Sequence, residues 1–444
     1  MTEITALLED VLRHAKACGA DAADALHYDA SDVSVNVRNG APEELERSEE
    51  CGVGLRVFVG KRNAIISSSD IKLDTLKKAA ERAIDMAKAS PEDAYTGLAP
   101  EELLCRDVPD LDLYDGDEPS AEALQEACMA CEAAALEEKG ITNSEGADAH
   151  YGRAHATLVT SHGFIGETSS SSSSLSLSVI AGKGSGMERD YDYSVARHRS
   201  DVKSPEAIGK EAARRTMQRM NPRKMDTKQV PIVFDPRVSK SLVGQFARAI
   251  SGSAVARGTS FLKGAMGEQV FADGVSIIDE PHRKRALGSE PFDDEGVAND
   301  TLKLIEGGVL QHWLLDTRSA NQLGLTTNGR GSRSLGSHPS PSSTNLYMAA
   351  GALPPEELIG DIQDGFYVTD LFGMGVNLIT GDYSQGASGL WIEKGQLAFA
   401  VSEVTIAGHL RDMFKRLTPA NDLVFEYGTN CPTVRVDGMT VAGV

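Results

Sequence analysis

The chain has 444 residues, of which 41% are hydrophobic and 25% are charged, which is ordinary for a folded globular protein of two or three domains. Its 65 acidic residues outnumber the 44 lysines and arginines, and the net charge is −21. Direct binding to nucleic acid or to an anionic membrane surface is therefore not expected, because both depend on clustered Lys and Arg.

The sequence indicates a cytoplasmic protein with reduced thiols. No secretory signal and no apolar run of membrane-spanning length is visible, and the six cysteines are scattered. Two of them, Cys128 and Cys131, form a C-x-x-C inside an alanine-rich helical stretch. A thioredoxin-like site needs a helix start after a strand, and a zinc site needs a second ligand pair, so buried thiols are the favoured interpretation.

Helical and strand patterns alternate twice in the first half of the chain. Helices are predicted at Glu3–Ala17, Lys72–Lys88, Ala121–Glu138 and Pro205–Met220. The predicted strands are Val33–Val37, Gly52–Val59, Asn63–Ser69, Ile141–Ala149, His155–Ser161, Leu175–Ala181 and Tyr191–Arg197. This order predicts two related α/β subdomains with antiparallel sheets, residues 1–95 and 118–220, in an N-terminal domain of residues 1–225.

The second half, residues 226–444, is predicted to be a mainly antiparallel, β-barrel-like domain, which makes the whole chain α+β. The strand Gln229–Phe234 leads into an amphipathic helix, Pro236–Ser251. The pattern I-E-x-G-x-L occurs at Ile305–Leu310 and at Ile392–Leu397, and is typical of tight hairpins. The Gly- and Ser-rich segment Gly329–Ser343 is predicted to be a long mobile loop, either disordered or covering a substrate.

Few sequence patterns carry a definite chemistry. None of the ten histidines lies in an H-E-x-x-H context, and no G-x-S-x-G, P-loop or G-x-G-x-x-G motif is present. The acidic run Asp293-Asp294-Glu295 has two interpretations. It could perform acid–base chemistry or bind a cation, or its side chains could fix a turn before Gly296.

Several longer motifs in the second half resemble the TldD/PmbA family. They are Phe292-Asp-Asp-Glu-Gly296, Leu315-Asp-Thr-Arg-Ser319, Thr344-Asn-Leu-Tyr-Met348 and the Gly-rich stretch Gly375–Gly408. The likeness extends over nearly the whole chain. It implies a cytoplasmic heterodimer of TldD and TldE subunits, a metalloprotease that takes extended peptides into an internal cavity. The family is also labelled "modulator of DNA gyrase". The strong negative charge of this chain gives no support for direct contact with DNA.

The resemblance also implies where a zinc motif should lie. In the TldD branch the helix at Pro236–Ser251 carries H-E-x-x-x-H, and the matching positions here are Val243, Gly244 and Arg248. Valine has no ligand atom, glycine has no carboxylate, and arginine stays cationic and would repel a metal. Cys431 lies beyond the position of the later TldD cysteine ligand. These departures are similar to the PmbA branch, also called TldE.

The lead hypothesis is therefore a subunit without catalytic residues, without a cofactor of its own, and with zinc on a TldD-like partner. Two alternatives stay open: a stand-alone peptidase with an unrecognised metal site, and a peptide-binding homodimer without chemistry. Arg257, Asp294, Glu295 and Asn377 are candidates for lining the substrate cavity. The sequence does not decide between a homodimer and a heterodimer for the isolated chain, nor does it name the substrate.

Overall fold

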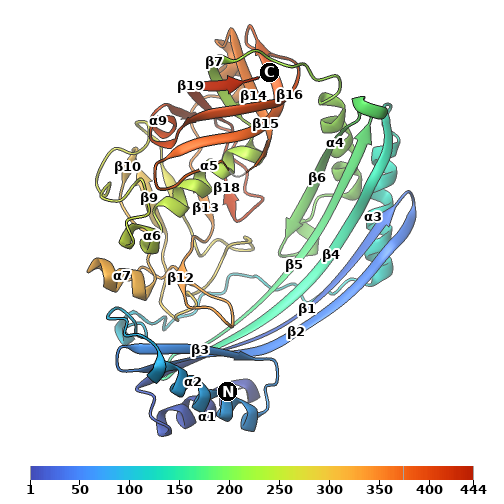
Figure 1. Cartoon of the computed structure of the whole chain (residues 1–444). Helices are drawn as coiled ribbons and strands as arrows, with labels where there is room; N and C mark the ends of the chain where they lie inside the picture. Colours follow the sequence, from blue (N-terminus) through green and yellow to red (C-terminus); the bar gives the residue numbers. More distant parts are fainter. Residues whose placement is uncertain (1, 374, 444) are drawn as a thin grey trace.

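The computed structural model describes residues 2–373 and 375–443, and its first half is built on one long, curved antiparallel sheet (Figure 1). The strand order is β3-β2-β1-β4-β5-β6. Its strands are β1 (Ala22–Arg38), β2 (Ala41–Val59), β3 (Arg62–Ser68), β4 (Ile141–Thr160), β5 (Ile165–Ala181) and β6 (Glu188–Ala196). The predicted antiparallel pairing is confirmed. The two subdomains nevertheless share a single sheet, because β1 pairs with β4 along most of its length.

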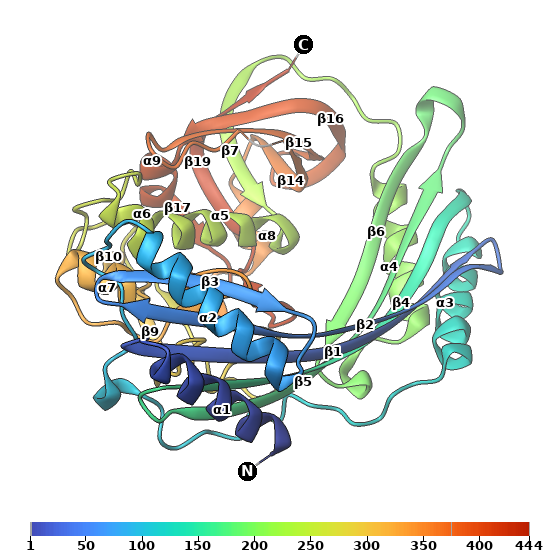
Figure 2. The same cartoon turned by 60° about the horizontal axis from the view of Figure 1, so that its bottom comes forward.

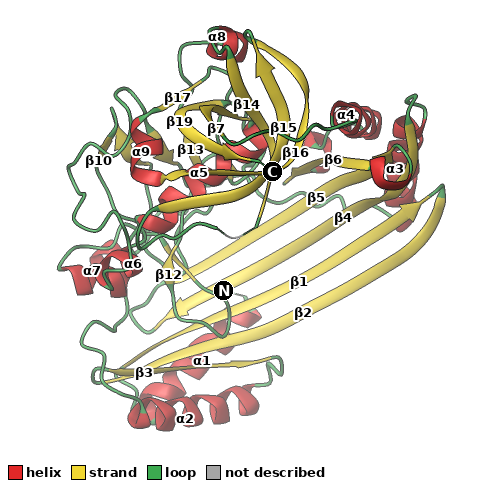
Figure 3. Ribbon diagram, turned by 45° about the horizontal axis from the view of Figure 1, so that its top comes forward, coloured by secondary structure: helices red, strands yellow, loops and turns green. Residues whose placement is uncertain are grey.

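Two helix pairs cover opposite ends of this sheet (Figure 3). Helices α1 (Glu3–Ala17) and α2 (Leu73–Ala89) lie across β1, β2 and β3 (Figure 2) and bury one apolar core. Helices α3 (Ala121–Leu136) and α4 (Pro205–Gln218) bury a second core against β1, β4 and β5. Each pair follows the predicted order of helix, strands and helix. Cys128 and Cys131 lie in the second core, and burial raises the pKa of each thiol to about 12.

One strand prediction in the first half needs correction, and the predicted strand Leu175–Ala181 begins earlier, at Ile165. Ile141–Ala149 and His155–Ser161 belong to one uninterrupted strand, β4, because Tyr151, Arg153 and their neighbours pair with β1 on one side and β5 on the other. The serine run Ser169–Ser174 lies inside β5, with alternate hydroxyl side chains turned inward. Cross-strand pairing therefore outweighs the weak local preference of Ser and Gly for strands.

Five strands of the second half close into a barrel, which confirms the predicted barrel-like domain (Figure 1). They are β7 (Lys228–Phe234), β14 (Asp364–Phe372), β15 (Asp382–Glu393), β16 (Gln396–His409) and β19 (Val434–Ala442). β16 pairs with β15 and also with β19, and this second pairing closes the ring. β7 and β14 run parallel, and the other neighbours in the ring are antiparallel. Strand β17 (Leu417–Pro419) adds to β19.

The remaining elements of the second half are short. A second sheet has the order β10-β9-β8-β13-β18, and β11 pairs with β12. The strands are β8 (Ile277–Asp279), β9 (Leu302–Glu306), β10 (Val309–Leu310), β11 (Gly331–Ser332), β12 (Ser340–Pro341), β13 (Leu346–Met348) and β18 (Thr429–Asn430). The helices are α5 (Pro236–Ala249), α6 (Gly252–Ala256), α7 (Thr317–Leu323), α8 (Pro355–Gly360) and α9 (Leu410–Lys415). Three 3-10 turns, Glu101–Leu103, Gly184–Gly186 and Arg199–Asp201, lie in the first half.

Both predicted I-E-x-G-x-L hairpins are present, as β9–β10 and β15–β16. Their glycines, Gly308 and Gly395, have φ values of 86° and 77°, which glycine adopts without steric cost. No helix in residues 2–373 and 375–443 is long and apolar enough to cross a membrane.

The segment Gly329–Ser343, predicted to be mobile, is instead fixed by buried contacts. The Arg330 side chain is fully buried, and its Nε donates to Asp279 Oδ2 at 2.5 Å. Gly331 N donates to Asp293 Oδ2 at 2.9 Å. An arginine in a Gly/Ser-rich stretch is expected to be exposed to solvent. Arg330 can be buried because its charge is paired with the buried carboxylate of Asp279.

The same segment joins the two halves of the molecule through an ion network. Arg333 Nη1 lies 2.7 Å from Asp24 Oδ1, and Arg56 Nη2 lies 2.5 Å from Asp24 Oδ2. Arg56 Nη1 also lies 3.6 Å from Glu295 Oε1. Burial alone would raise the pKa of Asp24, but Arg333 and Arg56 more than offset it, so the pKa lies below its ordinary value. The network thus ties β1 and β2 to the second half.

Close backbone packing accompanies this network. A Cβ placed on Gly54 in β2 would lie 2.1 Å from the backbone oxygen of Leu335, so only glycine permits this approach. Gly244 in α5 is the opposite case, since a Cβ placed there meets no atom within 4 Å.

We predict that Gly54→Ala destabilises the protein and that Gly244→Ala does not. The first substitution must push the Leu335 segment off β2, with an overpacking cost of about 1–3 kcal/mol. The second replaces a glycine in a helix interior and should stabilise the protein by about 0.5–1 kcal/mol. Urea denaturation of both variants measures the difference. Equal unfolding midpoints would show that the Leu335 contact does not hold the halves together.

Candidate functional site

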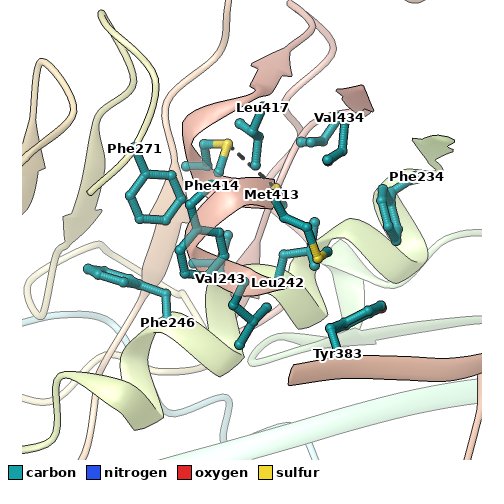
Figure 4. Close-up of a cluster of buried hydrophobic side chains, with 14 of the residues drawn as sticks. Phe234, Leu242, Val243, Phe246, Phe271, Tyr383, Met413, Phe414, Leu417 and Val434 are labelled. Carbon is teal, nitrogen blue, oxygen red and sulfur yellow. Dashed lines mark hydrogen bonds between the residues drawn. The ribbon is translucent and has the colours of Figure 1, made fainter. Parts of the chain in front are cut away.

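Helix α5 is the element on which the question of activity depends. Asp235 caps its N-terminus by accepting a hydrogen bond from Arg237 N at 2.9 Å, and Pro236 occupies the first turn. Leu242, Val243 and Phe246 point into the barrel-side core, toward the rings of Phe271 and Phe414 (Figure 4). Those two rings stack with centroids 4.3 Å apart. The buried face therefore positions the helix firmly.

The three positions of the absent zinc motif face different directions. Val243 is 0% exposed and belongs to the core. Gly244 and Arg248 lie on the other side, where they line an open groove of about 650 Å³. Because a side chain at Gly244 would meet only open space, packing does not explain why a carboxylate is missing there.

The α5 groove, as we call this cavity, has a lining without metal-ligating side chains. Two arginines, Arg248 and Arg257, the amide of Gln245 and a set of hydroxyl groups supply its polar side-chain atoms, and no Asp, Glu, His or Cys is among the lining residues. A zinc site needs Cys, His or carboxylate ligands. The groove as formed by this chain has none of them.

Cys431 does not supply a thiolate to the groove. Its side chain is buried on the core side of α5, and its carbonyl oxygen lies within reach of Ser239 Oγ at 3.5 Å. Burial raises the pKa of the Cys431 thiol to about 12, so it stays protonated at neutral pH.

The predicted cavity-lining residues do not gather at one site. Arg257 lines the α5 groove. Asn377 Oδ1 instead accepts hydrogen bonds from Ile379 N at 2.9 Å and Thr380 N at 3.3 Å, and so holds a turn. Asp294 and Glu295 lie at the junction of the two halves. These residues lie on separate loops, and a sequence does not show how far apart separate loops are in space. The sequence therefore could not predict which of the four candidates lie together.

The acidic run is built into a turn and its surroundings. Asp293 Oδ1 accepts from Glu295 N and Val297 N, both at 2.9 Å, and Gly296 has a φ of 82°. Asp294 Oδ2 accepts from Arg333 N at 2.8 Å. Glu295 Oε2 accepts from Thr317 N at 2.7 Å. The carboxylates therefore bind backbone groups of neighbouring loops.

Glu290 is a partly buried acid beside this turn. With Asp294 and Arg197 it lines a small cavity of about 110 Å³. Burial raises the pKa of Glu290 well above its ordinary value, and the nearby Asp294 and Asp293 raise it further. Between the ordinary pKa of 4.5 and the raised value, the folded protein keeps a proton that the unfolded chain releases.

We predict that Glu290→Gln weakens the pH dependence of stability. In that pH window the wild-type free energy of unfolding should fall by about 1.4 kcal/mol per pH unit relative to the variant. The variant should match the wild type near pH 4.5 and exceed it at pH 8. Urea denaturation across this range is the measurement, with the exposed Glu102→Gln as a control. Parallel stability curves for wild type and Glu290→Gln would contradict the raised pKa.

One group of potential metal ligands exists elsewhere among the described residues. His14 and Cys18 of α1 and Glu81 of α2 place their ligand atoms within 4.8 Å of one another. His14 Nε2 lies 2.9 Å from Glu81 Oε1 and 3.5 Å from Cys18 Sγ. The i, i+4 spacing of His14 and Cys18 could have revealed this pair in the sequence. The group lies on the outer helices of the N-terminal sheet and not at α5, so it cannot complete the motif.

Comparison with known proteins places this architecture among metallopeptidases. Models for the first, central and C-terminal domains of the PmbA/TldA metallopeptidases match residues 23–87, 114–220 and 227–443. The metalloprotease PmbA of Escherichia coli O157:H7 is 37% identical over 96% of this chain and 93% of its own length. A metalloprotease TldD homologue of Haemophilus influenzae is 28% identical over 48% of this chain and 46% of its own.

Solved structures agree with these matches. A proposed modulator of DNA gyrase from Bacteroides thetaiotaomicron superposes with a TM-score of 0.91 at 28% identity, covering 100% of both chains. TldE of Thermococcus kodakarensis has the same fold, with a TM-score of 0.84 at 20% identity, covering 98% of this chain and 100% of that one. The chain belongs to the PmbA/TldD metallopeptidase family.

Proposed function

We propose that this chain is the non-catalytic, TldE-type subunit of a cytoplasmic two-protein metalloprotease. A TldD-type paralogue with an H-E-x-x-x-H helix would supply the zinc and the catalytic base. This chain would complete the cavity and hold extended peptide substrates. The observation that carries the proposal is the α5 groove, whose lining has neither ligand nor base where the motif would lie.

Two further observations support a partnered role. The relative named PmbA aligns over nearly the whole chain, whereas the one named a TldD homologue aligns over about half of it. The helix itself is complete, with its cap and its buried face in place, so the fold does not depend on a metal there.

Room for a peptide exists on the side where the N-terminal sheet faces the barrel domain. Cavities of about 350 and 510 Å³ lie between α4 and β6 on one side and the segment 422–431 on the other. Aromatic and cationic side chains meet there, with Arg283 Cζ 3.4 Å from the ring centroid of Phe425. Such walls suit an extended chain, which offers backbone amides and side chains in alternation.

We predict that the chain alone has no peptidase activity and that activity appears on mixing with the paralogue. Size-exclusion chromatography should show a complex of one chain of each kind. Peptide cleavage should disappear when the Glu of the paralogue's H-E-x-x-x-H is replaced by Gln, because that residue supplies the base. Failure of the two proteins to associate would refute the proposal.

The same preparation separates the alternative functions. A stand-alone peptidase would cleave without the paralogue and lose activity to a chelator. A non-enzymatic homodimer would bind peptide without turnover even in the mixture. Metal analysis should include Cys18→Ser, since zinc that this variant loses belongs to the His14 group and not to a peptidase centre.

A further inference from the structure

The α5 groove is a cationic, acid-free surface on a strongly acidic protein. Although the chain carries a net charge of −21, the ionisable side chains in the groove lining are Arg248 and Arg257. Hydroxyl groups from four segments surround them, contributed by Ser241, Ser251, Ser253, Thr259, Ser342 and Ser343. Clefts lined by one sign of charge concentrate ligands of the opposite sign.

The two guanidinium groups are not committed to carboxylates of the described chain. Arg248 Nη1 makes one long contact, 3.5 Å from Gln245 Oε1, and Arg248 forms no ion pair within residues 2–373 and 375–443. Both arginines are exposed, and neither Arg257 nor Arg248 has an acid beside it in the groove lining. Nearby arginines of the fold differ, since Arg237 and Arg215 each hold an aspartate at 2.9 and 2.8 Å.

The α5 groove continues into a second cavity of about 490 Å³, with which it shares Ser253, Arg257 and Pro341. Four Asp and Arg side chains are added there, and three of them form ion pairs: Arg56 with Asp24, and Arg318 with Asp93. Arg318 Nε lies 2.6 Å from Asp93, and Asp316 Oδ1 accepts from Ser319 N at 2.9 Å. Arg257 therefore lies at the junction of two cavities, and it forms no ion pair within residues 2–373 and 375–443.

We infer that the α5 groove binds a carboxylate of the peptide substrate, either its C-terminal α-carboxylate or an acidic side chain. Arginine suits this role because its planar fork donates two parallel hydrogen bonds to a carboxylate. The hydroxyls can donate to and accept from the peptide backbone. The inference rests on the proposed function for the supply of peptide, but the binding belongs to this chain alone.

The test uses the full-length chain without its partner and measures fluorescence anisotropy of a labelled, unstructured peptide. Three forms of one sequence are compared: a free C-terminus, a C-terminal amide, and an amide with one internal Glu. The free acid, the Glu-containing amide or both should bind more tightly than the plain amide, and this preference should shrink with salt. The third form distinguishes an α-carboxylate site from an acidic side-chain site.

Matched variants complete the experiment. Arg248→Gln with Arg257→Gln should weaken binding of the carboxylate forms about tenfold or more and remove their preference over the amide. Arg13→Gln, at an exposed α1 position, makes the same chemical change elsewhere and should have no effect. The inference is overturned if neither carboxylate form binds more tightly than the plain amide, if no form binds, or if the double variant keeps the preference. Because no partner is present, these outcomes are independent of subunit association.

Discussion

The rest of the structure depends on the buried contact between Asp24, Arg56, Arg333 and Glu295. Asp24 and Arg56 come from neighbouring strands of the first half, and Arg333 and Glu295 come from loops of the second. Removing one member of such a network leaves an unpaired buried charge, at a cost of about 3–5 kcal/mol. Ion pairs of this kind add little net stability over apolar packing, so their main effect here is to fix orientation.

The contacts of this network extend to a wall of the α5 groove. Glu295 also binds the backbone of Thr317 at the start of α7, and the strand pair β11–β12 extends from Gly331 to Pro341, which lines the groove. The N-terminal sheet therefore helps to place a wall of the groove although it contributes no residue to it. A substitution at Asp24 would therefore change the position of the groove wall only indirectly, through the loops that carry Arg333 and Glu295.

The sequence predicts what depends on local periodicity. Helix α1 has its predicted bounds, and α5 begins at its predicted residue, because caps and apolar spacing define them. Features that depend on distant parts of the chain were not predicted. The continuous strand β4 needs its pairing with β1 and β5, and the burial of Arg330 needs Asp279, and neither partner can be recognised from the local sequence. The α5 groove was not predicted either, because its walls come from segments that are far apart in the sequence.

The order β3-β2-β1-β4-β5-β6 has a consequence for the origin of the first half. Each set of three strands follows one helix and precedes another, and the sets meet through the antiparallel pair β1–β4. Two copies of one helix–hairpin unit that met edge to edge about a two-fold axis would form this sheet as an isologous dimer. In this chain, residues 90–120, between α2 and α3, connect the two units covalently. In the present chain both ends of the sheet contact the second half, one through Arg333 and Asp24 at 2.7 Å and the other through Arg237 and Asp190 at 2.9 Å, so each unit has acquired its own contacts with the same domain.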